Sequence, residues 1–298
     1  MKIRNTAIQS WKDCRKAFLL SWALGYRRKG LPPQPLLLGQ LVHVGLAAFH
    51  QGKSAQEALL AAATELAGKP GSLSAADVEN LETAHGLAQA MCLGYAAHYK
   101  GGKDFQQVEI PFEFPIGNEH HLTGTIDGLK TESDDLWVVE HKTTSDFSQP
   151  YFDAASISTQ IMGYMVGARK LTGRWPKGVI YNVIFKSALR QRTKEDRPEF
   201  FKRVHQQYLE EPTEMFRRVP IVVPKRQLAS YMADLSYITH QIAEAVANME
   251  RLPEAFYPNT GTCLRGRSPC QHLPTCSAYQ DRPDPHFWAV SPEDIVHV

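Results

Sequence analysis

The sequence has no long apolar run, few cysteines and almost no net charge. No stretch approaches the roughly 20 apolar residues that a membrane-spanning helix needs, so we expect no membrane anchor. The N-terminal residues lack an apolar block followed by a small-residue cleavage site, so we expect a cytoplasmic protein without a secretory signal. Five cysteines are too few, and odd in number, for a disulfide scaffold. Cys92, on an apolar helix, is expected to be an ordinary buried thiol.

The remaining composition is that of an ordinary globular chain. Hydrophobic residues make up 43% and charged residues 21% of the 298 positions, which excludes disordered and collagen-like chains. The length allows one large domain or two small ones, with a core that needs no disulfides. We interpret residues 1–298 as a single domain. The sequence contains no phosphate-binding loop of the GxxxxGKS or GxxxxGKT type, so the chain has no helicase motor of its own.

Positive charge is concentrated in two segments, although the formal net charge is only +2. The first segment covers residues 1–30, and the second runs over residues 186–203. Charge clusters of this kind are usually solvated faces of a protein. Clustered lysines and arginines also bind the phosphate backbone of nucleic acids, because binding releases counterions. The charge distribution alone leaves both interpretations open.

The hydrophobic periodicity predicts an α/β fold. Helical period is present at 8–26, 36–52, 152–171 and 225–251, and a helical insertion is expected at 54–99. Period-two alternation predicts strands at 105–116, 121–130, 135–144 and 177–187, and a less regular one at 198–208. The first three strands would form an antiparallel meander. The fourth would join the sheet after a helical crossover.

The second and third strands carry charged side chains in apolar surroundings. Asp127 lies near the end of one strand, while Glu140 and Lys142 leave the same face of the next, because strand side chains alternate. Two neighbouring carboxylates are costly without a cation between them, and such oxygen ligands suit Mg²⁺ or Mn²⁺. The alternative is that Asp127 opens a turn and Glu140 pairs with Lys142 on an exposed face. The flanking valines favour a buried strand, where an unused charged pair is uncommon.

Four short motifs resemble those of the PD-(D/E)XK nuclease superfamily, and more narrowly its RecB-type branch. They are GQLVH at 39–43, GTID at 124–127, EHK at 140–142 and QIMGY at 160–164. Each motif alone is weak, but the four occur in the order that the branch shows. The resemblance implies a restriction-endonuclease-like core of helix, three-stranded meander, helix and strand. The helical insertion and a cysteine-rich C-terminal clasp at 252–298 would be added to this core.

The resemblance implies a metal site. Asp127 and Glu140 would be its ligands, the carbonyl of His141 would add a third, and His43 would complete the shell. Without the other motifs, His43 would be interpreted as a satisfied core histidine on an apolar helix. Glu109, on the first strand, is a further candidate for the edge of the site. A solvent-facing role is equally compatible with its position in the strand pattern.

The resemblance also implies catalytic roles. Asp127, Glu140 and Lys142 would form the catalytic set, with Lys142 serving the attacking water. Gln160 and Tyr164 lie one helical turn apart and so share a face. They would contact substrate or orient Lys142. The alternative for Gln160 and Tyr164 is an ordinary amphipathic boundary face.

Four cysteines carry a second resemblance. A subset of RecB-type nucleases, including AddB-type subunits and CRISPR-associated nucleases, holds a 4Fe–4S cluster with one N-terminal and three C-terminal cysteines. Cys14, Cys263, Cys270 and Cys276 match that arrangement, although the C-x6-C-x5-C spacing departs from the common one. Three thiols in a loop rich in Gly and Pro suit a soft metal or cluster. Zinc, with His272 as the fourth ligand, and free thiols are the alternatives.

Together these features predict a metal-dependent DNA exonuclease that uses Mg²⁺ or Mn²⁺ on single- or double-stranded DNA. It would act in DNA repair, recombination or phage DNA processing, alone or with a helicase or recombination partner protein. The first alternative is a non-catalytic nucleic-acid-binding protein that retains the nuclease fold. The second is a small-molecule metalloenzyme. Intact Asp127, Glu140 and Lys142 favour the nuclease.

Overall fold

The computed structural model describes residues 1–68, 73–100, 105–117, 119–264, 269–278, 280, 282–285, 288–292 and 295–296. Within this part of the chain, no helix is both long and apolar enough to cross a membrane. The chain divides into two compact units, each built from segments far apart in the sequence. The smaller unit comprises Met1–Lys29, Glu113–Gly124 and Pro224–Val298, and the larger comprises Gly30–Phe112 and Thr125–Val223. The single domain expected from the sequence stays a prediction.

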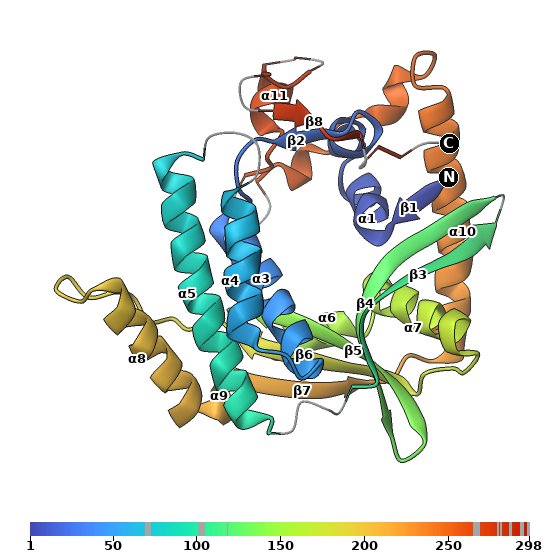
Figure 1. The fold of residues 1–298 in the computed structure, drawn as a ribbon. Helices are drawn as coiled ribbons and strands as arrows, with labels where there is room; N and C mark the ends of the chain where they lie inside the picture. Colours follow the sequence, from blue (N-terminus) through green and yellow to red (C-terminus); the bar gives the residue numbers. More distant parts are fainter. Residues whose placement is uncertain are drawn as a thin grey trace. The chain divides into compact units, whose positions relative to one another are not determined.

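A mixed sheet forms the centre of the larger unit (Figure 1). Its strands are β3 (Gln107–Gly117), β4 (His120–Glu132), β5 (Asp135–Thr144), β6 (Gly178–Phe185) and β7 (Phe216–Ile221), and β1 (Lys2–Arg4) pairs in parallel with the start of β4. β3 pairs with β4, β4 is antiparallel to β5, and β6 joins β5 in parallel. The crossover from β5 to β6 contains α6 (Gln149–Ala155) and α7 (Thr159–Thr172). The predicted meander and helical crossover are confirmed, whereas β7, antiparallel to β6, was not predicted.

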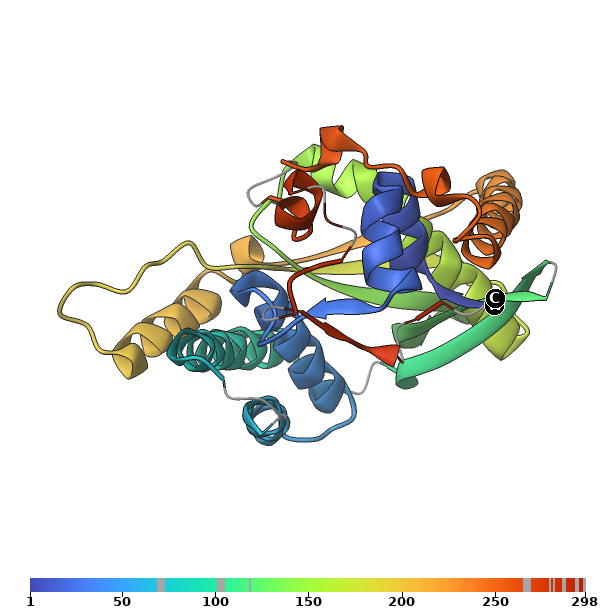
Figure 2. The same cartoon turned by 90° about the horizontal axis from the view of Figure 1, so that it is seen from above.

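Helices of the larger unit pack into an apolar core. They are α3 (Gln34–His50), α4 (Ala55–Ala67), α5 (Ala75–His98), α8 (Arg197–Glu210) and the short α9 (Pro212–Met215). The insertion expected at 54–99 consists of α4 and α5, and the capping box of Ser74 and Asp77 starts α5. α5 and α8 lie side by side (Figure 2). A Cβ at Gly94 would lie 2.3 Å from Tyr208, so only glycine permits this approach.

The prediction of a strand at 198–208 is wrong, because these residues belong to α8. Asp196 and Glu199 form a capping box at the start of this helix, and proline occupies its first turn. Phe200, Val204 and Tyr208 are buried four residues apart, which is the spacing of one helix face. Helix-capping residues therefore outweigh the β-prone residues of the segment.

The smaller unit holds both ends of the chain. Its first elements are β1 (Lys2–Arg4), α1 (Asn5–Asp13), α2 (Arg15–Phe18), a π-helical turn (Leu19–Ala23) and β2 (Tyr26–Arg28). Its later elements are α10 (Lys225–Ala247), 3₁₀ turns at Pro253–Phe256 and Thr260–Thr262, α11 (Leu273–Ser277) and β8 (Trp288–Val290). The helix expected over 8–26 is interrupted at Cys14, whose backbone is extended. β2 pairs with β8, which ties the N-terminal segment to the C-terminal one.

Candidate metal and active site

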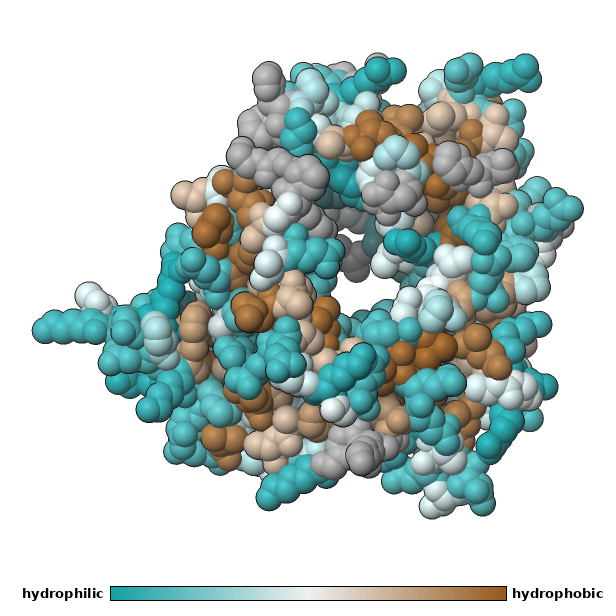
Figure 3. Space-filling model, viewed as in Figure 1, coloured by the Kyte–Doolittle hydropathy of each residue, from teal (hydrophilic) through white to brown (hydrophobic). Residues whose placement is uncertain are grey.

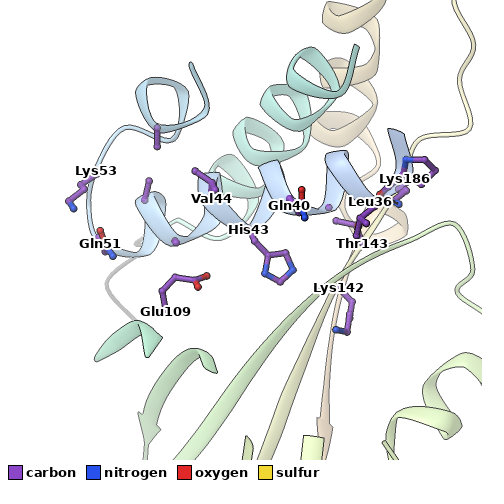
Figure 4. Close-up of a pocket in the computed structure, with 15 residues that line it drawn as sticks. Leu36, Gln40, His43, Val44, Gln51, Lys53, Glu109, Lys142, Thr143 and Lys186 are labelled. Atoms are coloured by element: carbon purple, nitrogen blue, oxygen red, sulfur yellow. Dashed lines mark hydrogen bonds between the residues drawn. The ribbon is translucent and has the colours of Figure 1, made fainter. Parts of the chain in front are cut away.

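Three elements of the larger unit bring possible metal ligands together. His43 comes from α3, Glu109 from β3 and Asp127 from β4, and one ligand atom of each lies within 4.8 Å of the others. The His43 Nδ1 and Asp127 Oδ1 atoms are 3.4 Å apart. In Figure 4, the Glu109 carboxylate extends toward the His43 ring, and Lys142 lies below them. Histidine nitrogen and carboxylate oxygens are the donors that borderline and hard divalent cations accept.

Asp127 is held in a fixed orientation by β5. Its Oδ2 accepts the backbone N–H of His141 at 2.7 Å, which leaves Oδ1 directed to His43. Burial opposes ionisation of Asp127, but the hydrogen bond and charge of His43 outweigh it and lower the pKa of Asp127. Burial likewise favours neutral His43, yet Asp127 and Glu140 together raise the pKa of His43. The pair therefore carries charge on both partners.

Glu140 is the most deeply buried carboxylate of the site, with 1% of its surface exposed. Its only ion pair among the described residues is with Lys142 Nζ, and neither carboxylate oxygen accepts a hydrogen bond of normal geometry there. Burial and the negative charge of Asp127 raise the pKa of Glu140 to about 8. A buried carboxylate without donors, beside an ionised one, is suited to a divalent cation. The donors present therefore fit Mg²⁺ or Mn²⁺.

Lys142, Gln160 and Tyr164 form a short hydrogen-bonded chain. Lys142 Nζ donates to Gln160 Oε1, and Gln160 Nε2 donates to the Tyr164 hydroxyl, both at 2.9 Å. Burial tends to lower the pKa of Lys142, but Glu140 and Asp127 outweigh burial and raise it. Lys142 therefore keeps its proton on Nζ. The sequence interpretation of Gln160 and Tyr164 as neighbours of Lys142 agrees with these contacts, while their roles stay predictions.

Glu109 is the residue whose position the sequence left open. The structure places its carboxylate with His43 and Asp127, on a backbone with φ of +49°. Non-glycine residues rarely adopt this left-handed conformation, which costs about 1–3 kcal/mol and is concentrated at functional sites. Local desolvation and the charge of Asp127 raise the pKa of Glu109. Strand alternation gives no signal for such a backbone, so the sequence alone favoured neither interpretation.

A groove of about 800 Å³ opens beside these residues along α3 (Figure 4). His43, Glu109 and Lys142 lie in its wall. The rest of the wall combines apolar and cationic side chains, among them Leu36, Val44, Lys53 and Lys186. The groove gives a substrate access to His43, Glu109 and Lys142.

The four cysteines of the predicted cluster gather in the smaller unit. The backbone N–H of Asn259 donates to Cys14 Sγ at 3.3 Å, and the N–H of Cys270 donates to the carbonyl of Cys263 at 2.7 Å. Burial, followed by the nearby thiols of Cys14, Cys270 and Cys263, raises the pKa of Cys276. Among the described residues, no three of these sulfurs lie within 4.8 Å of one another. Residues 265–268, within the cysteine-rich segment, lie outside the described residues.

His272 and Cys92 are the remaining two residues with a metal or thiol prediction from the sequence. His272, the alternative zinc ligand, shares a hydrogen bond of 2.7 Å between its Nε2 and Ser21 Oγ, and its ring stacks on Trp288. Its Nε2 is therefore engaged within the fold. Cys92 is a buried thiol, as predicted, and burial raises its pKa to about 12.

Comparison with known families shows which superfamily the chain belongs to. The sequence model of the PD-(D/E)XK nuclease superfamily matches residues 5–277, so the chain belongs to this superfamily. Members of this superfamily are nucleases that use divalent metal ions. The family predicted from the four motifs is thereby confirmed, as is the restriction-endonuclease-like α/β fold. Among curated proteins, none matches the chain.

Several solved structures resemble the chain distantly. A protein of Eubacterium rectale, provisionally named as an exonuclease, shares 12% identity over 93% of this chain and 87% of its own, with a TM-score of 0.47. The protein SSO0001 shares 10% identity over 78% and 84% of the two chains, with a TM-score of 0.29. VC1899 of Vibrio cholerae shares 12% over 75% and 60%, with a TM-score of 0.22. The family assignment rests on the sequence model.

Proposed function

We propose that this protein is a Mg²⁺- or Mn²⁺-dependent DNA exonuclease. The observation that carries the proposal is the buried Glu140 carboxylate, which is adjacent to ionised Asp127 and has Lys142 as its ion-pair partner. Burial and the charge of Asp127 disfavour the ionised form of Glu140, and a bound divalent cation would offset both. The resemblance of the four motifs to the RecB-type branch supports the proposal of DNA as substrate and of cleavage from chain ends.

In the proposed reaction, His43, Glu109, Asp127 and Glu140 would hold the cation, with the carbonyl of His141 as a further predicted ligand. When bound, a divalent ion supplies Lewis-acid chemistry and lowers the pKa of a coordinated water. Ionised Asp127 and Glu140 balance the charge of the centre. No helicase motor is needed for this chemistry, and a helicase or recombination partner stays a prediction, as does a cytoplasmic location.

Lys142 would act as a hydrogen-bond donor and a source of positive charge. Because Glu140 and Asp127 raise its pKa, it keeps the proton on Nζ and orients the attacking water or stabilises negative charge that develops on the phosphate. Gln160 fixes the direction of the ammonium group through its Oε1 atom, and Tyr164 fixes Gln160 in turn. This arrangement favours a positioning and electrostatic role over that of a general base.

The basic segment at 186–203 supports a polyanionic substrate for the larger unit. Arg190, Arg192, Lys194 and Lys202 are exposed there, whereas Arg203 is engaged by Glu195. The loop before α8 and the adjoining helix surface are hydrophilic, at the left edge of Figure 3. Lysines and arginines on such a surface bind phosphates without reading sequence.

We also propose that Cys14, Cys263, Cys270 and Cys276 hold a 4Fe–4S cluster. In a zinc site with Zn–S bonds of about 2.3 Å, neighbouring sulfurs would be about 3.8 Å apart. Among the described residues, no three of the sulfurs lie within 4.8 Å of one another, which favours a cluster, in which each thiolate binds a different iron, over a single zinc ion.

The proposed function can be tested by digestion of end-labelled linear DNA beside closed circular DNA, each single- and double-stranded. The protein should be purified anaerobically and assayed with Mg²⁺, Mn²⁺ or EDTA. Loss of the linear forms alone, abolished by EDTA, is expected of an exonuclease. Cutting of circles would make the protein an endonuclease. Tight binding of DNA by the folded protein without any cleavage would favour the non-catalytic alternative.

A further inference from the structure

A ring of buried and half-buried polar side chains in the larger unit includes His141, the neighbour of Glu140. Asn182 Nδ2 and His141 Nδ1 are 2.7 Å apart, and Arg218 Nε donates to Asn182 Oδ1 at 3.1 Å. A second nitrogen of Arg218 donates to the Tyr95 hydroxyl at 2.8 Å, which lies 3.2 Å from His50 Nε2. The His50 ring stacks on His141 with 5.5 Å between centroids, which closes the circuit. Its members come from β5, β6, β7, α5 and α3.

Arg218 determines which group donates and which accepts in the hydrogen bonds that link it through Asn182 to His141. A guanidinium group only donates hydrogen bonds, so the atom of Asn182 that faces Arg218 must be the carbonyl oxygen. The amide nitrogen of Asn182 therefore donates to His141 Nδ1, and the ring hydrogen of His141 resides on Nε2. One arginine thus fixes the orientation of an amide and the tautomer of a buried imidazole.

The surroundings of Arg218 indicate that packing alone does not explain an arginine at this position. Among the residues that the structure describes, no carboxylate lies within ion-pair distance of its guanidinium, which instead faces the Tyr99 ring at 3.7 Å and neutral oxygens. A half-buried cation without a counter-ion is costly, because it loses water without gaining an ion pair. An apolar side chain would fill the place at lower cost if packing were the only requirement.

The circuit reaches the metal site through His141. Its side chain is the point where the circuit joins β5, and its backbone N–H donates to Asp127 Oδ2 at 2.7 Å. A displacement of β5 at this residue would turn the Asp127 carboxylate and move the carbonyl of His141, which is itself a predicted ligand. Groups that orient metal ligands in this way commonly change metal affinity or activity by about 10–100-fold when they are removed.

We propose that Arg218 and Asn182 are positioning residues of the nuclease centre, which hold His141 so that its N–H fixes one oxygen of Asp127 and leaves the other for the metal. The inference rests on the proposed function and deepens it. Neither residue touches the substrate or the reacting atoms. Both act through His141.

The test compares Arg218→Met with Arg217→Met, a matched control on the same strand. Arg217 is exposed and stacks on Phe152, and its replacement changes the net charge by the same amount. Mn²⁺ binding measured by calorimetry should weaken about 10–100-fold in Arg218→Met, with kcat lowered and KM little changed. Arg217→Met should bind Mn²⁺ as the wild type does. Asn182→Leu should resemble Arg218→Met.

Arg218→Lys keeps the charge and the aliphatic stem, and so provides a folded variant without the planar pair of donors. It should also bind Mn²⁺ more weakly than the wild type. A lower melting temperature with unchanged Mn²⁺ affinity and kcat, in Arg218→Lys or Arg218→Met, would overturn the inference and leave a purely structural role. A wild-type protein that binds no Mn²⁺ and cleaves no DNA would instead overturn the proposed function, so the two failures are distinguishable.

Discussion

Replacement of Glu140 by glutamine should stabilise the metal-free protein and abolish its response to metal. Glutamine has nearly the same shape, and its amide oxygen can accept a hydrogen bond from Lys142. It carries no charge, so the burial that raises the pKa of Glu140 has no ionised group to penalise. The substitution therefore separates the cost of the buried charge from its use in metal binding.

The pKa of Glu140 sets the size and the pH window of the effect. Because the pKa is raised from 4.5 to about 8, the folded wild type binds a proton that the unfolded chain releases between these two values. The stability of the metal-free wild type should accordingly fall as the pH rises through this window, by on the order of 4 kcal/mol at pH 8. Glu140→Gln should lack this loss, so the two proteins should be similar at pH 5 and differ at pH 8.

Metal should offset most of this loss in the wild type. At a Mg²⁺ concentration of 100 times the dissociation constant, the wild type should gain about 2.7 kcal/mol, because the ion binds only the folded state. Glu140→Gln should gain little, since one ligand oxygen has lost its charge. Cleavage by the variant should be lost.

Urea denaturation at pH 5 and pH 8, in EDTA and in Mg²⁺, measures these differences. Glu244→Gln, at an exposed carboxylate on α10, is the matched control and should show neither effect. A wild-type stability in EDTA that does not fall between pH 5 and pH 8 would refute the reasoning. So would a Glu140→Gln protein that is less stable than the wild type at pH 8 without metal.

Three further predictions follow from the contacts described above. Lys142→Met should lower the cleavage rate by about 10²–10³-fold, while calorimetry shows Mn²⁺ binding retained; wild-type turnover would contradict the role of Lys142. Cys14→Ser should reduce the iron content of anaerobically purified protein and Cys92→Ser should not; equal iron in both variants would exclude Cys14 as a ligand. Lys194→Gln and Lys202→Gln should each reduce the slope of log K for DNA against log salt by about 1, and an unchanged slope would remove that residue from the DNA path.

The central chemistry of the site could be predicted from the sequence because strand geometry is regular. Side chains two apart leave the same face, so Glu140 and Lys142 had to be neighbours, and the short turn after β4 brings Asp127 to the adjacent strand. Helical spacing placed Gln160 and Tyr164 on one face in the same way, and their hydrogen bond agrees. These inferences need only the regular side-chain spacing of strands and helices.

Other features depend on backbone conformations and long-range contacts that strand or helix spacing does not indicate. Glu109 reaches the site through a left-handed backbone, which strand alternation cannot indicate. Arg218 lies on β7, a strand that was not predicted, so its bonds to Asn182 and Tyr95 could not be inferred. The error at α8 has a similar origin, since aromatic and β-branched residues such as Phe200 and Val204 favour strands until a capping box overrides them.

The measurement that tests the central claim most directly is cleavage of linear DNA by the wild type and Asp127→Ala side by side. Both proteins should be shown to be folded, and each should be assayed in Mg²⁺ and in EDTA. The wild type should hydrolyse phosphodiester bonds only with Mg²⁺, and Asp127→Ala should be inactive under both conditions. Activity of Asp127→Ala near the wild-type rate, or wild-type cleavage that persists in EDTA, would contradict a metal centre at these carboxylates.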